Sequence, residues 1–151
     1  ESNFGKINFM LFNVSYNEPK VNQAIEELVG KSFGLFENIK LNGTGSPRLL
    51  IHKASEEIQT LLDYDHNLNY CNIELRPKGI IIRFRSLLET YGLAIPYYKL
   101  VVFKPANYLS LHADHHLVSV EFPAKNAGIH QFYEKMMAQK VKNTPTNIDD
   151  L

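Results

Sequence analysis

Histidine and aspartate side chains gather in residues 111–116, which read LHADHH. Imidazole and carboxylate groups are common ligands of zinc, nickel and copper. Neighbouring side chains on a strand point to opposite faces, so His115 and His116 would not both reach one ion. At most one histidine of that pair can therefore join His112 and Asp114 at a metal ion. We expect that histidine to be His115. The alternative interpretation is a polar turn between two strands.

The other reactive side chains do not indicate catalysis. The thiol of Cys71 falls on the inner face of an expected strand, where a free cysteine is usually a small buried hydrophobe. Paired acids occur at residues 56–57 and 149–150, at a helix start and in a tail, where the helix dipole and solubility account for them. Residues 42–47 contain glycines but lack the Gly-Lys-Ser/Thr ending of a phosphate loop. We therefore expect no catalytic residue, no cofactor and no enzymatic activity.

Composition limits the class of protein. The chain has 151 residues, of which 44% are apolar and 21% charged, enough for one core but not for two. Its 16 basic and 16 acidic residues give no net field that would favour nucleic acid, and we expect no nucleic-acid partner. A single cysteine excludes an internal disulfide, which favours a reducing, cytoplasmic location, with association to a membrane left open.

The first part of the chain predicts one helix and a loop. Pro19 follows a polar helix entry, and apolar residues then recur at helical spacing up to Gly30, where the helix should end. Residues 40–47 gather glycine, serine and proline between two apolar runs, which marks a domain boundary. A short helix is expected after Ser55, which can cap it. Whether residues 1–45 pack on the rest or form a separate arm is left open.

Residues 70–85 predict a β-hairpin. Apolar residues alternate on both sides of Arg76-Pro77-Lys78-Gly79, which suits a type I turn. In that register Cys71 and Ile73 share the inner face with the apolar residues of the second strand, and the other face carries Asn72, Glu74, Arg83 and Arg85.

Further strands are expected at residues 97–104, 108–113 and 117–122, with Pro96 at the entry of the first, because proline cannot donate to a ladder. Only one of Tyr97 and Tyr98 should then be accessible. A helix burying one side follows through residue 141. The predicted fold class is α+β: a bent antiparallel sheet or open β-barrel capped by a C-terminal helix. The predicted domains are an N-terminal extension with one helix (1–45), the sheet domain (46–142) and a flexible tail (143–151).

The segments GIIIRF, AIPYYKL and YLSLHADHHLVSVEF, followed by the closing helix, resemble the pleckstrin-homology-like superfamily. The likeness spans residues 69–141 and is nearest to bacterial members, whose second hairpin commonly leads through an Ile-Pro-Tyr step. It implies a PH-like fold whose sheet is a scaffold for binding lipid headgroups, peptides or other domains, and it implies that catalysis is rare. The chain has no tryptophan, so Phe132 or Tyr133 would take the place of the one typical of eukaryotic members.

The resemblance also points to a basic site. Phosphoinositide-binding members share a pattern of lysine, spacer, basic residue, any residue and arginine across the first hairpin, and Lys78, Arg83 and Arg85 stand in that form. The two arginines lie two apart on one strand, roughly 6 to 7 Å from each other, a spacing suited to phosphate oxygens. The turn at residues 77–79 is tighter than the flexible loop of those members, and the alternative is a solvated strand face.

The leading hypothesis is a non-catalytic interaction module that binds a protein or a membrane-associated partner. The second hypothesis is a metal-binding or small-ligand-binding protein centred on His112, Asp114 and His115. The third is an anionic lipid-headgroup binder that uses Lys78, Arg83 and Arg85. Because an open sheet leaves its edges unpaired, a homodimer is a further expectation left open.

Overall fold

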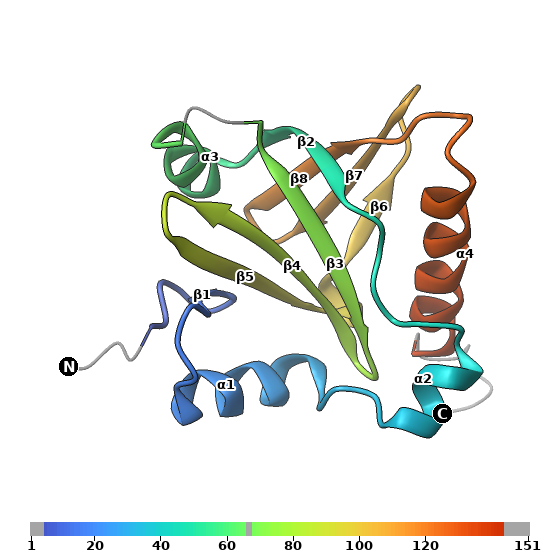
Figure 1. The fold of residues 1–151 in the computed structure, drawn as a ribbon, viewed down its shortest axis with the longest axis horizontal. Coiled ribbons are helices and arrows are strands. Elements are labelled where there is room, and N and C mark those ends of the chain that lie inside the picture. Colours follow the sequence, from blue (N-terminus) through green and yellow to red (C-terminus); the bar gives the residue numbers. More distant parts are fainter. Residues whose placement is uncertain (1–4, 66–67, 144–151) are drawn as a thin grey trace.

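The computed structural model describes residues 5–65 and 68–143, and in them it shows an open antiparallel sheet of eight strands in the order β1-β5-β4-β3-β2-β8-β7-β6 (Figure 1). The strands are β1 (Leu11–Asn13), β2 (Leu49–Ala54), β3 (Tyr70–Arg76), β4 (Gly79–Ser86), β5 (Glu89–Pro96), β6 (Val101–Phe103), β7 (Tyr108–Ala113) and β8 (His116–Glu121). The helices are α1 (Pro19–Val29), α2 (Leu35–Lys40), α3 (Glu56–Asp63) and α4 (Ala127–Lys142), with a 3-10 helix η1 (Tyr97–Lys99). The α+β class expected from the sequence is confirmed.

The sheet bends at β2, which belongs to two ladders. Leu49 and Leu50 pair with β3, whereas Ile51, Lys53 and Ala54 pair with β8, and the register shifts between Ile51 and Lys53. An extra residue of this kind increases local twist and turns a strand. We call β1, β5, β4 and β3 the first half of the sheet and β8, β7 and β6 the second half, with β2 shared by both.

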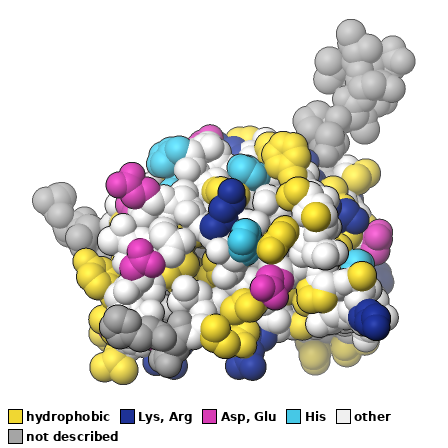
Figure 2. Space-filling model, turned by 90° about the horizontal axis from the view of Figure 1, so that it is seen from above, with side chains coloured by type: hydrophobic (Ala, Val, Ile, Leu, Met, Phe, Trp, Pro, Cys, Tyr) yellow, Lys and Arg dark blue, Asp and Glu magenta, His cyan; other side chains and the backbone are white. Residues whose placement is uncertain are grey.

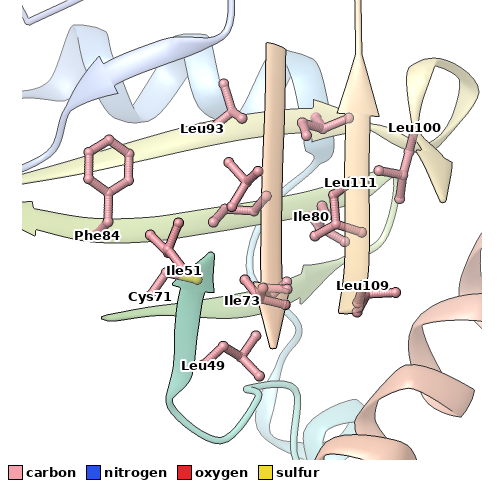
Figure 3. Close-up of a cluster of buried hydrophobic side chains, with 14 of the residues drawn as sticks. Leu49, Ile51, Cys71, Ile73, Ile80, Phe84, Leu93, Leu100, Leu109 and Leu111 are labelled. Atoms are coloured by element: carbon pink, nitrogen blue, oxygen red, sulfur yellow. The ribbon is translucent and has the colours of Figure 1, made fainter. Parts of the chain in front are cut away.

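The main core lies between the two halves. Figure 3 shows apolar side chains of β3, β4 and β5 directed toward those of β7, with Leu49 and Ile51 of β2 beside them. Two helices close this core with fully buried apolar residues: Ile58 and Leu62 of α3, and Ile129, Phe132 and Met136 of α4. The prediction that the last helix buries one side is therefore confirmed, although Val141, at the end of the predicted range, is exposed.

The predicted hairpin at residues 70–85 is confirmed in its register. Cys71 pairs with Phe84, Ile73 with Ile82 and Leu75 with Ile80, and Arg76 faces Gly79 across the turn. Gly79 has no room for a side chain, because a Cβ atom there would lie 2.3 Å from the carbonyl oxygen of Ile95.

The N-terminal segment packs on the sheet. Strand β1 pairs with β5, and α1 covers part of the outer face of the first half, as Figure 1 shows at the lower edge of the sheet. A second, smaller apolar cluster fills that contact: Phe12, Val21, Ile25, Val29, Ile81 and Ala94. Helix α1 begins at Pro19 and ends before Gly30, whose φ of 88° favours glycine, so both predicted ends are confirmed.

The strand predicted at residues 97–104 is wrong in its first part. Residues 89–96 form β5, which the sequence reading missed, and Pro96 ends that strand instead of starting the next. Tyr97 then begins η1, and its N–H donates to the carbonyl of Lys78 at 2.8 Å. Tyr97 is 2% exposed and Tyr98 76%, so the expectation that only one of the two is accessible is confirmed.

Candidate anion-binding site

Three arginines line one hollow on the outer side of the first half of the sheet. Arg48, Arg83 and Arg85 surround a depression of about 570 Å³ together with Tyr70, Asn72 and Thr90. Leu68, Leu87 and Asp65 complete its rim. We call this hollow the arginine pocket.

Strand alternation explains how β4 supplies two of these arginines. Phe84 points into the core, so Arg83 and Arg85 point outward on either side of it, as the sequence predicted. Arg85 also donates a long hydrogen bond of 3.4 Å to the carbonyl of Leu87 in the following turn.

The third arginine, Arg48, was missed by the sequence analysis. Leu49 pairs with Cys71, and continuing this register by one residue brings Arg48 beside Asn72, which pairs with Arg83. The guanidinium of Arg48 lies over the ring of Tyr70 at 4.2 Å, a cation–π contact that holds it at the pocket. The pairing of β2 with β3 carries this information, and it cannot be read from spacing along the chain.

Glu74 forms an ion pair with Arg83, the least exposed of the three pocket arginines. Its carboxylate accepts hydrogen bonds from Arg83 at 2.8 Å and from Arg76 at 2.9 Å. Burial alone would raise the pKa of Glu74, but the hydrogen bonds and positive charges of the two arginines lower it below its ordinary value. Arg76 also donates to the carbonyl of Gly30 at 2.8 Å, so it is committed to the structure and not to a ligand.

The pocket carries a surplus of positive charge. Among the described residues, its lining contains three arginines and one aspartate, a formal difference of two charges. Asp65 accepts the backbone N–H of Leu87 at 3.1 Å and so fixes the β4–β5 turn. Among residues 5–65 and 68–143, neither Arg48 nor Arg85 forms an ion pair. Both residues are exposed, so their positive charges can meet an anion from solution.

Lys78 lies apart from this site. It occupies the β3–β4 turn, where its N–H donates to the carbonyl of Val29, and it does not line the pocket. Arg85 is six residues further along β4 from Gly79, or roughly 20 Å along the strand. Lys78, Arg83 and Arg85 therefore do not form one site; the structure brings Arg83 and Arg85 together with Arg48 instead.

The residues proposed as metal ligands have other contacts. The ammonium of Lys99 lies 2.8 Å from the carboxylate of Asp114 and lowers the pKa of that carboxyl group. The ring of His112 lies edge-on to Phe103 at 5.2 Å, and His115 lies beside His116. In the described ranges, no three His, Cys, Asp or Glu side chains are placed to hold a metal ion. Figure 2 shows histidines at separate points of the upper face instead of in one group.

A second hollow, of about 630 Å³, lies between α3 and the β7–β8 turn, and its lining includes Glu56, Glu57, His115 and His116. His116 is 2% exposed, and within the described residues its Nδ1 atom has no hydrogen-bond partner. Desolvation, with the charge of His115, lowers its pKa, although Glu57 and Asp114 act in the opposite direction. A neutral, buried imidazole of this kind is a structural feature and not an exposed ligand.

The thiol of Cys71 is buried, as predicted, and burial raises its pKa to about 12. It is therefore protonated at neutral pH and is a poor nucleophile.

No helix in the described part of the chain is long and apolar enough to span a membrane. Comparison of the chain with protein-family models, with curated proteins and with solved structures finds no match in any of the three.

Proposed function

We propose that the protein is a non-catalytic interaction module that binds an anionic membrane surface through the arginine pocket. The observation that carries the proposal is the convergence of Arg48, Arg83 and Arg85 on one open hollow. A guanidinium group presents a planar fork of donors that matches phosphate oxygens, and it keeps its charge at any physiological pH. Tyr70, Asn72 and Thr90 line the same hollow and can add neutral hydrogen bonds.

Exposed leucines beside the pocket favour a membrane over a soluble anion. Leu68 and Leu87 stand at its rim with 67% and 57% of their surface exposed, and Leu88 at the tip of the β4–β5 turn is 85% exposed. Leu87 has a φ of 57°, which is costly for a leucine and keeps the turn tight. Apolar side chains next to basic ones are the combination that enters the boundary between headgroups and acyl chains.

The expected binding is weak and sensitive to salt. Each arginine near an anionic surface contributes about 1 kcal/mol, so Arg48 and Arg85, which form no ion pair within the described residues, together contribute about 2 kcal/mol, and partial insertion of the leucines adds to this. Screening should remove most of the arginine contribution at high ionic strength.

The fold supports the proposal. A bent antiparallel sheet with a C-terminal helix over one end is the scaffold that the resemblance to the pleckstrin-homology-like superfamily implies. In that superfamily the sheet presents binding surfaces and rarely catalyses a reaction. The PH-like assignment of this chain is part of our proposal.

Cosedimentation with vesicles tests the arginine contribution. The wild-type protein should bind vesicles of phosphatidylserine and phosphatidylcholine at low salt and bind phosphatidylcholine alone much less. Arg48→Glu with Arg85→Glu should lower the affinity at least about tenfold. The control is Lys53→Glu with Lys78→Glu, which makes the same change of charge at exposed positions outside the pocket. Equal losses in the two double variants, or no binding by the wild-type protein, would contradict the proposal.

The leucines separate a membrane from a soluble phosphorylated partner. Leu87→Ser with Leu88→Ser should weaken vesicle binding several-fold while leaving the protein folded, because both side chains are exposed. Binding of a soluble phosphate ester, measured by calorimetry, should not change. If the leucine variant binds vesicles as well as the wild type, the pocket serves a soluble anion and the membrane assignment is wrong.

A further inference from the structure

The two edges of the sheet differ in how they are covered. The segment before β1 folds back along its free side: Lys6 bridges to Phe12, and the N–H of Asn13 donates to the carbonyl of Gly5 at 2.7 Å. At the other edge, no backbone hydrogen bond in the described ranges joins β6 to anything other than β7. Figure 1 shows β6 as the last strand beside β7. An uncovered edge is a template for another strand.

The sequence of β6 is suited to pairing. Val102 points toward the core, while Val101 and Phe103 point outward with 48% and 54% of their surface exposed. The strand contains no charged residue, no proline and no bulge, the devices that protect most exposed edges.

The two lysines that flank β6 both contact other side chains of the same molecule. Lys99 forms an ion pair of 2.8 Å with Asp114. The ammonium of Lys104 lies 4.4 Å from the ring centre of Tyr133 and 5.4 Å from that of Phe122. Neither lysine therefore stands as a free charge at the edge.

We propose that β6 pairs with β6 of a second copy of this chain, antiparallel and related by a two-fold axis at Val102. In that register Val101 of each copy lies opposite Phe103 of the other, a β-branched and aromatic pair that stabilises antiparallel ladders. Lys104 lies opposite Leu100 and Lys99 opposite Pro105, so no like charges meet.

This dimer is weak, because a three-residue strand and two apolar side chains per copy are a small interface. It depends on protein concentration and does not rest on the proposed membrane function, since β6 belongs to the second half of the sheet and the arginine pocket lies on the first.

Cysteine cross-linking tests the register. A mixture of Val101→Cys and Phe103→Cys proteins should form a disulfide-linked heterodimer at least about tenfold faster than either variant alone. Residues directly opposite have Cβ atoms roughly 5 Å apart, against roughly 7 to 8 Å for the diagonal pairs within each single variant. The native thiol, Cys71, is 3% exposed and should not interfere. Equal rates in the mixture and in the single variants would overturn the pairing.

Charge variants test the surface independently by sedimentation across a concentration series. Val101→Lys with Phe103→Lys, and Val101→Glu with Phe103→Glu, should each raise the dimer dissociation constant at least about tenfold, and mixing the two should restore association. The control is Leu35→Lys with Ile39→Lys on α2, where both side chains are also exposed. A wild-type protein that stays monomeric at every concentration, or a dimer lost only in the α2 control, would overturn the proposal. Unchanged circular dichroism of the variants shows that they remain folded.

Discussion

The outer faces of the two halves of the bent sheet are covered to different extents. On the first half, α1 covers the outer face with an apolar cluster of its own, and the uncovered remainder carries the arginine pocket. Among the described residues, the second half has no outer apolar cluster of this kind, and it carries ring pairs such as His52 on Tyr108, at 4.2 Å, and Phe103 on His112, at 5.2 Å. The first half has therefore gained an extra layer, whereas the outer face of the second half keeps ring pairs on its strands.

Strand β4 shows how the sequence encodes this difference. Its first part, Ile80, Ile81 and Ile82, is fully buried because both faces of the strand are covered. Its second part alternates Arg83, Phe84 and Arg85, because only the inner face is covered there. A continuous apolar run within a strand thus marks where an additional layer packs, and alternation marks where it ends.

The largest expected effect is on the covered face. Ile81→Ala should lower the free energy of unfolding by about 3 kcal/mol, because it removes a fully buried side chain beneath α1 and leaves a cavity. Val101→Ala, at an outward position of the second half that is 48% exposed, should change it by less than about 0.5 kcal/mol. Denaturant titration of both variants measures the contrast. Similar losses would show that the two outer faces are equally covered.

A smaller loss is expected at the ion network of the first half. Glu74→Gln removes the charge between Arg76 and Arg83 and should cost about 2 kcal/mol, because the Arg76 side chain is only 10% exposed. Release of Arg83 should at the same time strengthen binding to anionic vesicles. The control, Glu121→Gln, changes an exposed carboxylate on the second half and should alter neither quantity. A variant that loses stability and vesicle binding together would contradict the role given to Arg83.

The halves also differ in how much of them could be predicted. The β3–β4 register followed from alternation, because one face of each strand is core and the other is largely polar. Strand β5 was missed because Leu93, Ala94 and Ile95 are all buried, Ala94 beneath α1 and the other two in the main core, so the alternation is lost. That covering depends on a helix that lies more than 60 residues earlier in the chain.

Only part of the candidate site could be predicted, because part of it also depends on contacts between distant segments. Arg83 and Arg85 share a face by strand geometry alone. Arg48 joins them only because β2 bends and pairs with β3 over two residues, Leu49 and Leu50. Lys78 was grouped with the arginines by its position in a pattern, but the β3–β4 turn places it at the other end of the hairpin.

A buried histidine on the inner side of the second half should make the free energy of unfolding depend on pH. The pKa of buried His116 is lowered from the ordinary value of 6.5, so below that pH the unfolded chain binds a proton that the folded protein does not. The free energy of unfolding should therefore fall as pH decreases below 6.5, by at most about 1.4 kcal/mol per pH unit from this group. His116→Leu should flatten the slope, whereas His52→Gln, at an exposed position, should keep it. If the stability of His116→Leu depends on pH as steeply as that of the wild type, another titrating group causes the dependence.

The smallest effect is expected at the junction of the halves, in η1 between β5 and β6. The hydroxyl of Tyr97 donates to the carbonyl of Arg76 at 3.2 Å within the core, and burial raises its pKa. Tyr97→Phe should cost about 1 kcal/mol of unfolding free energy, because that carbonyl loses a buried partner. Tyr98→Phe, at a residue that is 76% exposed, should be neutral within a few tenths of a kcal/mol. If the two substitutions cost the same in denaturant titrations, the hydrogen bond from the buried hydroxyl of Tyr97 in η1 to β3 does not contribute to stability.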